Sequence, residues 1–216
     1  MIKQIKASTS EKILFVFLIL LVIFSFSFVF IIKNKCLFVK NIDPTKINFK
    51  NPNNIVVMNV ECGNVIIELY PDISPKTVER FKILINQKMY DGSAFYKVSE
   101  NTFVQAGDIE YGNINNLDYS KIGSGKSGLG LLKSELSNDF KFTEGSVGFA
   151  RATEFDTEDS EFFITLKEIP IYQGEYTPIG KVVYGLDILT KIKTGNKAIY
   201  VLRPDYIKTF RMFNSN

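Results

Sequence analysis

Residues 95–108, "FYKVSENTFVQAGD", show apolar and polar alternation that predicts two short strands joined by a turn. Because side chains alternate along a strand, Phe95 and Lys97 share one face of the first strand, and Phe103 and Gln105 share one face of the second. The stretch contains no histidine, no catalytic-looking serine and no metal-ligand spacing. It combines a cation, an amide and aromatic rings, so any chemistry here must work with those groups alone.

The composition of the 216-residue chain excludes several classes of site. It contains no histidine, which removes the usual general base near neutral pH and the commonest metal ligand. Cys36 and Cys62 are too few for the common four-ligand zinc sites or for a disulfide framework, so we expect two free thiols. A net charge of +3, without a block of Lys and Arg, argues against nucleic-acid binding. We expect no metal, no cofactor and no nucleic-acid partner.

Residues 13–32, "ILFVFLILLVIFSFSFVFII", form an uncharged apolar stretch long enough to cross a bilayer. A cleaved signal peptide has a shorter apolar stretch and a small-residue cleavage site, and neither is present. We therefore expect a single-pass signal anchor, preceded by a tail of residues 1–12. The lysines on its two sides nearly balance under the positive-inside rule. Short N-terminal tails usually stay inside, which predicts an extracytoplasmic domain, periplasmic in a diderm bacterium.

The rest of the chain divides into a linker and one domain. Residues 33–53 are rich in Lys and Asn, contain two prolines and show no sustained periodicity, which predicts a linker. Residues 54–216 have the length of one domain with a substantial core.

Most predicted elements of the domain are strands. Residues 55–60 and 65–70, joined by a turn at 62–64, predict a hairpin. Ser74 as N-cap, Pro75 at the first helical position and apolar residues at helical spacing predict a helix after the hairpin. Further strands are expected near 95–98, 102–105, 146–150, 161–165, 179–183 and 206–212, with a second helix near 185–195. Many strands and two helices indicate a barrel or sandwich capped by helices.

Two other stretches imitate known sites. Within residues 123–130, "GSGKSGLG", the triplet Gly125-Lys126-Ser127 resembles the end of a phosphate loop. That loop needs a glycine five positions before the triplet, where this chain has Ser120, and no apolar strand precedes the stretch. We expect a flexible loop. Residues 153–161, "TEFDTEDSE", carry five carboxylates without the glycine and ligand spacing of an EF-hand. We expect a solvated acidic loop, apart from Glu161.

Four stretches line up with one family in order, separation and local pattern. They are residues 65–108, "GSVGFARA" (145–152), "SEFFIT" (160–165) and "YTPIGKVVYGLDILTKI" (176–192). Together they resemble the cyclophilin-type peptidyl-prolyl cis-trans isomerases over nearly the whole domain. The resemblance implies a mainly β fold, an eight-stranded antiparallel barrel capped by two helices, here preceded by one transmembrane helix. It also implies that the partners are proline-containing polypeptides.

An isomerase of Xaa-Pro bonds suits a site without histidine or metal. Rotation about the bond faces a barrier of roughly 18–20 kcal/mol, set by amide resonance. An apolar slot for the proline ring and a fixed donor aimed at the prolyl nitrogen bind the twisted bond better than either planar form.

The resemblance assigns roles to individual residues. Lys97 stands where the family has its catalytic arginine, and the neighbouring Tyr96 stands where it has histidine. Gln105 and Phe163 keep the family's glutamine and pocket phenylalanine. The substrate-binding positions are Thr102, Phe103, Ala150, Arg151, Glu161, Tyr172 and Tyr176. Ile171 takes the place of the indole that is associated with cyclosporin binding, so we expect weak binding of that drug.

Departures from the family pattern favour reduced activity. Lys97 is a flexible point charge where arginine is a planar fork, and Thr102 removes an aromatic ring from the proline slot. Because Glu161 replaces a glutamine of the same pocket, we expect an ion pair between Lys97 and Glu161. The sequence thus predicts a membrane-anchored isomerase that assists protein folding. The alternative is a catalytically weak or inactive module that binds proline-containing segments.

Overall fold

The computed structural model describes residues 8–33, 35–37, 39–195 and 200–213. The chain divides into two compact units, Met1–Phe38 and Val39–Asn216. The first unit contains helix α1 (Thr9–Lys33), and its stretch Thr9–Ile31 is long and apolar enough to cross a membrane. The large apolar side chains of this stretch are exposed, which is unfavourable in water.

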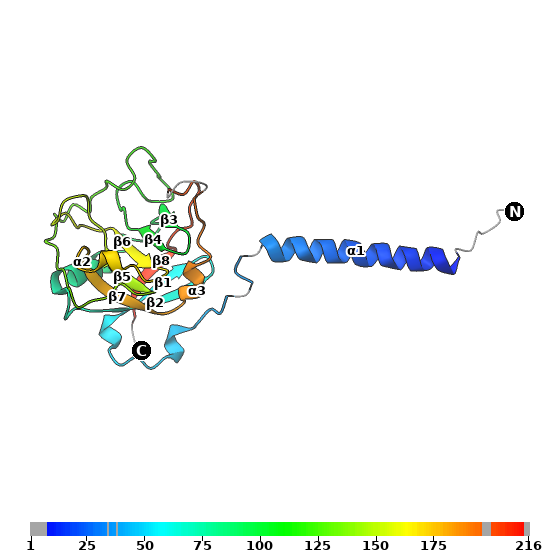
Figure 1. The fold of residues 1–216 in the computed structure, drawn as a ribbon, viewed down its shortest axis with the longest axis horizontal. Coiled ribbons are helices and arrows are strands. Elements are labelled where there is room, and N and C mark those ends of the chain that lie inside the picture. Colours follow the sequence, from blue (N-terminus) through cyan, green and yellow to red (C-terminus); the bar gives the residue numbers. More distant parts are fainter. Residues whose placement is uncertain (1–7, 34, 38, 196–199, 214–216) are drawn as a thin grey trace. The chain divides into compact units, whose positions relative to one another are not determined.

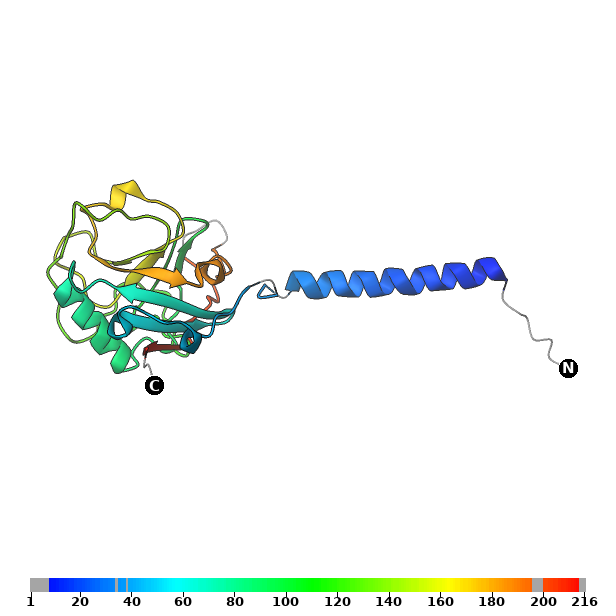
Figure 2. The same cartoon turned by 90° about the horizontal axis from the view of Figure 1, so that it is seen from below.

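The second unit is built on one eight-stranded antiparallel sheet (Figures 1 and 2). Its strands are β1 (Ile55–Val60), β2 (Gly63–Leu69), β3 (Lys97–Ser99), β4 (Phe103–Ala106), β5 (Ser146–Phe149), β6 (Phe162–Thr165), β7 (Pro178–Tyr184) and β8 (Thr209–Met212). Their order across the sheet is β3-β4-β6-β5-β7-β2-β1-β8. The predicted mainly β class and the predicted hairpin of β1 and β2 are both confirmed.

The two edges of the sheet are brought together by residues 200–207, which lead into β8. Backbone hydrogen bonds from Val201 to Tyr96 and from Ile207 to Ser93, each 2.9 Å long, attach this segment to the residues before β3. The edge strand β3 is therefore covered on its outer side, as sheet edges in soluble proteins generally are. The eight strands form a nearly closed barrel.

Helix α2 (Pro75–Asn86) begins after Ser74, as predicted. The hydroxyl of Ser74, however, donates to the backbone carbonyl of Pro178 and does not cap the helix. The carboxylate of Glu135 accepts instead from the backbone N–H of Thr77 at 2.8 Å. Because first-turn N–H groups have no partner inside a helix, a distant carboxylate supplies the cap and favours the positive helix end.

Phe81 of α2 is the centre of the core. It is fully buried, and its ring centroid lies 5.9 Å from Phe149 in β5, 5.2 Å from Phe162 in β6 and 5.5 Å from Phe210 in β8. Edge-to-face contacts of this kind join the helix to strands from different parts of the sheet. Helix α2 thus fills one end of the barrel.

The second predicted helix is shorter than expected. Helix α3 spans Leu186–Leu189 and lies at the opposite end of the barrel from α2 (Figure 1). It begins after Gly185, which has a φ of +84° and where a Cβ would lie 2.4 Å from the backbone oxygen of Asn64. Only glycine fits such a position. Short 3-10 helices occur at Pro44–Lys46, Pro52–Asn54 and Pro170–Tyr172.

Residues 39–53, predicted as part of the linker, belong to the compact unit. The side-chain oxygen of Asn41 accepts from the backbone N–H of Asn64 at 3.0 Å. The rings of Phe49 and Phe213 pack edge to face with centroids 5.0 Å apart. The unit therefore begins earlier than the predicted domain, because contacts with distant residues hold a segment that has no periodicity of its own.

Both cysteines, Cys36 and Cys62, are disulfide-bonded, so the expectation of two free thiols is wrong. Disulfide formation depends on the separation of Cα atoms in the folded chain, and spacing along the sequence does not give that distance.

We expect a fragment of residues 39–216 to be more stable than one of residues 54–216, by about 1–2 kcal/mol, because the shorter one lacks the Asn41 hydrogen bond and the Phe49 ring contact. Urea denaturation followed by circular dichroism measures the difference. Both fragments contain Cys62 and lack Cys36, so they differ only in residues 39–53. Equal midpoints would show that this segment contributes no stability.

Candidate active site

A row of paired residues crosses four neighbouring strands of the barrel, β3, β4, β6 and β5. Lys97 pairs with Gln105, Gln105 with Phe163, and Phe163 with Gly148. Directly paired residues of antiparallel strands place their side chains on the same face. The register therefore brings together the three residues that the sequence predicted to be catalytic.

Gly148 gives the ring of Phe163 its space. A Cβ at position 148 would lie 2.4 Å from Cζ of Phe163 and 2.9 Å from Cε1 of Phe142. The ring thus occupies space that a side chain at position 148 would fill, so the row ends at a glycine.

Phe163 is part of an aromatic wall, which we define by a hydrophobic cluster separate from the main core. Its buried members are Phe142, Ala150 and Phe163, and the partly buried Phe103, Phe140, Tyr172 and Tyr176 pack against them. The ring centroids of Tyr172 and Tyr176 each lie 5.2 Å from that of Phe163. Four of the predicted substrate-binding residues, Phe103, Ala150, Tyr172 and Tyr176, therefore meet in this wall.

Two residues of the aromatic wall were not predicted. Phe140 and Phe142 lie in a segment without strand periodicity, and their ring centroids are 5.2 Å apart. Their only signal in the sequence is two aromatic residues at alternate positions. Such a pair is as common in a core as in a site, so the sequence alone does not distinguish them.

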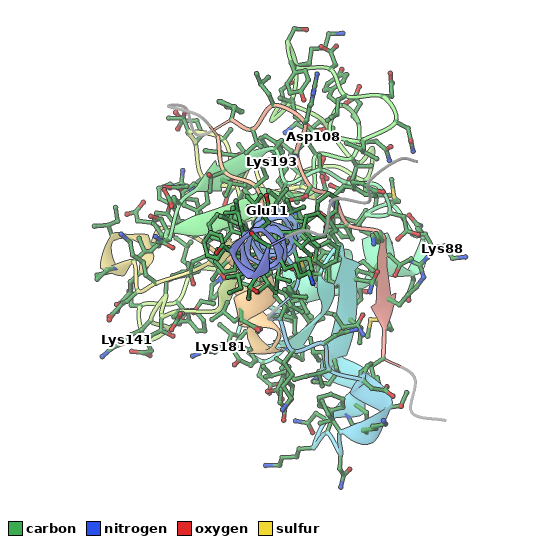
Figure 3. The ribbon with its side chains drawn as sticks, turned by 90° about the vertical axis from the view of Figure 1, so that its right-hand side faces the viewer. Glu11, Lys88, Asp108, Lys141, Lys181 and Lys193 are labelled. Carbon is green, nitrogen blue, oxygen red and sulfur yellow. The ribbon has the colours of Figure 1, made fainter. Side chains whose placement is uncertain are left out.

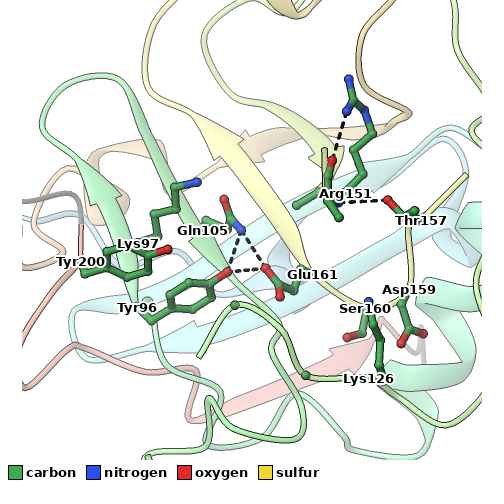
Figure 4. Close-up of a pocket in the computed structure, with 14 residues that line it drawn as sticks. Tyr96, Lys97, Gln105, Lys126, Arg151, Thr157, Asp159, Ser160, Glu161 and Tyr200 are labelled. Carbon is green, nitrogen blue, oxygen red and sulfur yellow. Dashed lines mark hydrogen bonds between the residues drawn. The ribbon is translucent and has the colours of Figure 1, made fainter. Parts of the chain in front are cut away.

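Three polar side chains beside the wall form a closed set of hydrogen bonds (Figure 4). Nε2 of Gln105 donates to the hydroxyl oxygen of Tyr96 and to Oε2 of Glu161, both at 2.8 Å. The hydroxyl of Tyr96 donates to the same carboxylate oxygen. The amide nitrogen of Gln105 therefore faces Glu161, and the amide oxygen points toward the side of Lys97 (Figure 4).

Burial changes how this set titrates. Burial, with the charge of Glu161 adding to it, raises the pKa of Tyr96 far above its ordinary value, so Tyr96 remains a donor. Burial also raises the pKa of Glu161, and the charge of Asp108 adds to that effect. The hydrogen bonds from Tyr96 and Gln105 lower the pKa of Glu161, as does the charge of Lys126. Burial is the largest of these effects.

The predicted ion pair between Lys97 and Glu161 is wrong: no such pair forms within the part of the chain that the structure describes. The carboxylate faces Tyr96 and Gln105. The ammonium of Lys97 lies 5.9 Å from the ring centroid of Phe103, within reach of a cation–π contact. Tyr96, which stands where the family has histidine, donates to the carboxylate of Glu161, so its hydroxyl lies where the ammonium of Lys97 was expected.

A pocket opens beside these groups (Figure 4). The predicted site residues that line it are Lys97, Gln105, Ala150, Arg151 and Glu161. It is also lined by Tyr96, Gly123, Gly125, Lys126 and Tyr200, which the sequence did not single out as site residues. Tyr200 reaches the pocket because its ring stacks on Tyr96, with centroids 6.1 Å apart.

The glycine loop, residues 123–130, is fixed at its start by a buried carboxylate. Lys88 and Lys141 extend from the surface in Figure 3, whereas Asp108 is fully buried. Asp108 accepts from the backbone N–H of Gly123 at 2.6 Å. The expected flexible loop is therefore held in place, and its N–H groups bind the protein's own carboxylate where a phosphate loop would bind phosphate.

The acidic stretch 153–161 is only partly solvated, contrary to expectation. Glu158 and Asp159 are buried. Asp159 accepts from the backbone N–H of Ser127 at 2.7 Å and forms an ion pair with Arg80 at 3.0 Å. It thus joins the glycine loop to helix α2 and fixes another wall of the pocket.

Arg151 lines the pocket without offering its guanidinium to it. That group donates to the backbone oxygen of Thr153 at 2.7 Å and to the carboxylate of Glu175 at 3.2 Å. It also lies 4.2 Å from the ring centroid of Phe155 and 5.1 Å from that of Tyr176. Its donors are used inside the protein, so its side chain supports the aromatic wall.

Thr102 is not brought into the site. Its hydroxyl donates to the backbone oxygen of Glu100 at 3.0 Å, and the next residue, Phe103, joins the aromatic wall instead. Ile171 is 78% exposed, next to Tyr172 of the wall.

Known proteins are similar to this chain over the whole barrel. The family model "Cyclophilin type peptidyl-prolyl cis-trans isomerase/CLD" matches residues 55–211. A "Probable peptidyl-prolyl cis-trans isomerase" of Brucella suis is 38% identical over 149 residues, which are 68% of this chain and 76% of that protein. A "Peptidyl-prolyl cis-trans isomerase" of Acinetobacter baylyi is 29% identical over 145 residues, 65% of this chain and 72% of that protein.

Solved structures share the fold. A cyclophilin-type peptidyl-prolyl cis-trans isomerase of Cryptosporidium parvum, crystallised in the presence of the dipeptide Ala-Pro, matches with a TM-score of 0.64 at 24% identity and covers 75% of this chain and 99% of its own. Cyclophilin AquaCyp293 from Hirschia baltica matches with a TM-score of 0.63 at 19% identity and 74% coverage of both chains. With the family match over the barrel, these findings show that the chain belongs to the cyclophilin-type peptidyl-prolyl cis-trans isomerases.

Proposed function

We propose that this member is a membrane-anchored isomerase of Xaa-Pro bonds that assists the folding of polypeptides outside the cytoplasm. The observation that carries the proposal is the row of Lys97, Gln105 and Phe163, aligned by strand register beside an aromatic wall. It places a cation and an amide of the pocket in one row with a ring of the aromatic wall.

The reaction is a rotation, so no covalent bond is broken and no proton has to move. The rings of Phe163, Tyr172 and Tyr176 offer an apolar surface to the proline ring. As the Xaa-Pro bond twists, the lone pair localises on the prolyl nitrogen, and the ammonium of Lys97 favours that state over both planar forms. The amide oxygen of Gln105 is available to accept from a substrate N–H.

A second candidate function is a module that binds proline-containing segments with little turnover. Two observations favour it. Lys97 offers a rotatable ammonium in place of a planar fork, and Thr102 lies outside the groove with its hydroxyl bonded to Glu100. Both features support a lower rate than an arginine and an aromatic ring would give.

Membrane attachment is supported by helix α1, which contains residues 13–32. The extracytoplasmic side is supported by the state of the cysteines, because Cys36 and Cys62 are both disulfide-bonded and disulfides persist in oxidising compartments. In a diderm bacterium that compartment is the periplasm.

The Lys97→Ala variant should lower kcat/KM by about a hundredfold or more, the usual effect of removing one transition-state donor. Lys97→Arg should raise kcat/KM above the parent. Exchange NMR on a blocked Ala-Pro peptide, with the full chain in detergent, measures both. Lys141→Ala, at an exposed lysine outside the pocket, is the matched control. Unchanged turnover by Lys97→Ala would exclude this ammonium as the donor, and binding shifts without exchange in the parent would favour the module.

Cyclosporin should bind weakly, and Ile171→Trp should strengthen binding by about tenfold, because the indole N–H supplies a donor that isoleucine lacks. Ile171→Phe is the matched control, with a ring but no N–H. Isothermal titration calorimetry of the parent, Ile171→Trp and Ile171→Phe with cyclosporin measures the three dissociation constants. A parent that binds as tightly as the tryptophan variant would contradict the expectation.

Protease added to a diderm bacterium that expresses the full chain should digest the barrel in spheroplasts and spare it in intact cells. The protected chain should keep its full length, because residues 13–32 remain as an anchor. Immunoblots against the barrel report both results. A barrel that survives in spheroplasts would place it in the cytoplasm, and a shortened chain would show a cleaved signal sequence.

A further inference from the structure

Glu161 is a carboxylate in the groove that the proposed mechanism leaves unused. It lies immediately before β6 and lines the same pocket as Lys97 and Gln105. Within the described residues it forms no ion pair. Its hydrogen bonds come from two neutral groups, Tyr96 and Gln105.

The Gln105 amide has one orientation that satisfies these contacts. Gln105 is 8% exposed, and its side-chain nitrogen lies 2.8 Å from both the hydroxyl oxygen of Tyr96 and Oε2 of Glu161. These two acceptors are bonded to each other, so the N–H₂ group faces both from one side. A flipped amide would place its oxygen about as close to the carboxylate as the nitrogen is now, and two acceptors would face each other. The hydroxyl of Tyr96 could donate to a flipped amide oxygen only by giving up its hydrogen bond to the carboxylate of Glu161.

We propose that Glu161 is a positioning residue: its ionised carboxylate holds the Gln105 amide with the oxygen toward the groove, and protonation of Glu161 releases this orientation. The inference rests on the proposed isomerase function. Gln105 is the group that touches the substrate, and Glu161 acts through it. Tyr96 completes the lock, since it donates to the carboxylate and accepts from the amide.

Protonation removes what the lock needs. Both incoming hydrogen bonds end on Oε2 of Glu161. A neutral carboxyl accepts hydrogen bonds more weakly than an ionised one, so protonation weakens the bonds that hold the Gln105 amide. The titratable and charged groups around Glu161 and its pocket are Tyr90, Tyr96, Lys97, Asp108, Lys126, Arg151, Asp159 and Tyr200. Of these, Asp108 and Asp159 are bound by N–H groups of the glycine loop.

The sign of the pH effect follows. Burial raises the pKa of Glu161 above the ordinary value for glutamate, against the hydrogen bonds from Tyr96 and Gln105. Above this pKa the carboxylate is ionised and the amide is held. As the pH falls through it, the amide is released and kcat/KM should fall, at a higher pH than an exposed glutamate would give.

The test compares the pH profiles of kcat/KM, measured by exchange NMR on a blocked Ala-Pro peptide with the full chain in detergent. Glu161→Gln keeps an acceptor without a titrating charge, so it should stay within about threefold of the parent at neutral pH and lose the acid fall. Glu161→Met removes the acceptor and should lose about tenfold at every pH. Tyr96→Phe should keep the acid fall but move it to higher pH, because a hydrogen bond that lowers the pKa of Glu161 is gone.

Glu168→Gln is the matched control, because it removes an exposed carboxylate beyond the other end of β6, and it should reproduce the parent profile. An acid fall that persists in Glu161→Gln would overturn the proposal, as would parental activity in Glu161→Met. If Glu161→Met does not fold, the pH profiles of Glu161→Gln and Tyr96→Phe still test the proposal.

A spectroscopic readout separates this proposal from the proposed function. The side-chain N–H₂ signals of Gln105 should shift with pH in the parent and stay constant in Glu161→Gln. If the parent shows no turnover at any pH, the isomerase function fails, yet these signals still test the lock. Signals that shift equally in both proteins would overturn it.

Discussion

The antiparallel register of β3, β4, β6 and β5 is the constraint on which the groove depends. One row of this register, Val98, Val104, Ile164 and Val147, is buried in the main core. The neighbouring row, Lys97, Gln105, Phe163 and Gly148, points to the other face. A slip by one residue would exchange the two rows and expose four apolar side chains. The free energy of core burial therefore holds the site residues in line.

The core supports this register from the inside. Phe81 of α2 packs against rings of β5, β6 and β8 at once, so one side chain holds the helix against three strands. The acidic residues extend the support to the pocket walls. Asp108 and Asp159 are buried, and each accepts backbone N–H groups of the glycine loop. Buried carboxylates are stable only with such partners, so the loop and the carboxylates fix each other.

Glu161 differs from these two carboxylates in its partners. Its partners are the side chains of Tyr96 and Gln105, whereas Asp108 and Asp159 accept backbone N–H groups, and the bonds at Glu161 also determine the direction of an amide in the pocket. Tyr96 and Glu161 both stand at positions where the family pattern has other residues, histidine and glutamine. The structure shows why the two departures belong together: the phenol reaches the carboxylate that replaces the glutamine. A substitution that looks like the loss of a pocket amide is one half of a new contact.

The sequence by itself determined the elements whose pattern is local. Alternation predicted the strands around Lys97 and Gln105, helical spacing predicted α2, and the family motifs singled out Phe163, which lies in the aromatic wall. The tertiary structure alone decided contacts between distant segments. Glu135 caps α2 from another part of the chain, and Asn41 and Phe49 bring residues 39–53 onto the barrel. The glycine loop closes on buried carboxylates, and Tyr96 takes the carboxylate expected to pair with Lys97. Periodicity reports which face of an element is apolar, whereas the partner of a polar group depends on which segments the fold brings within hydrogen-bond distance.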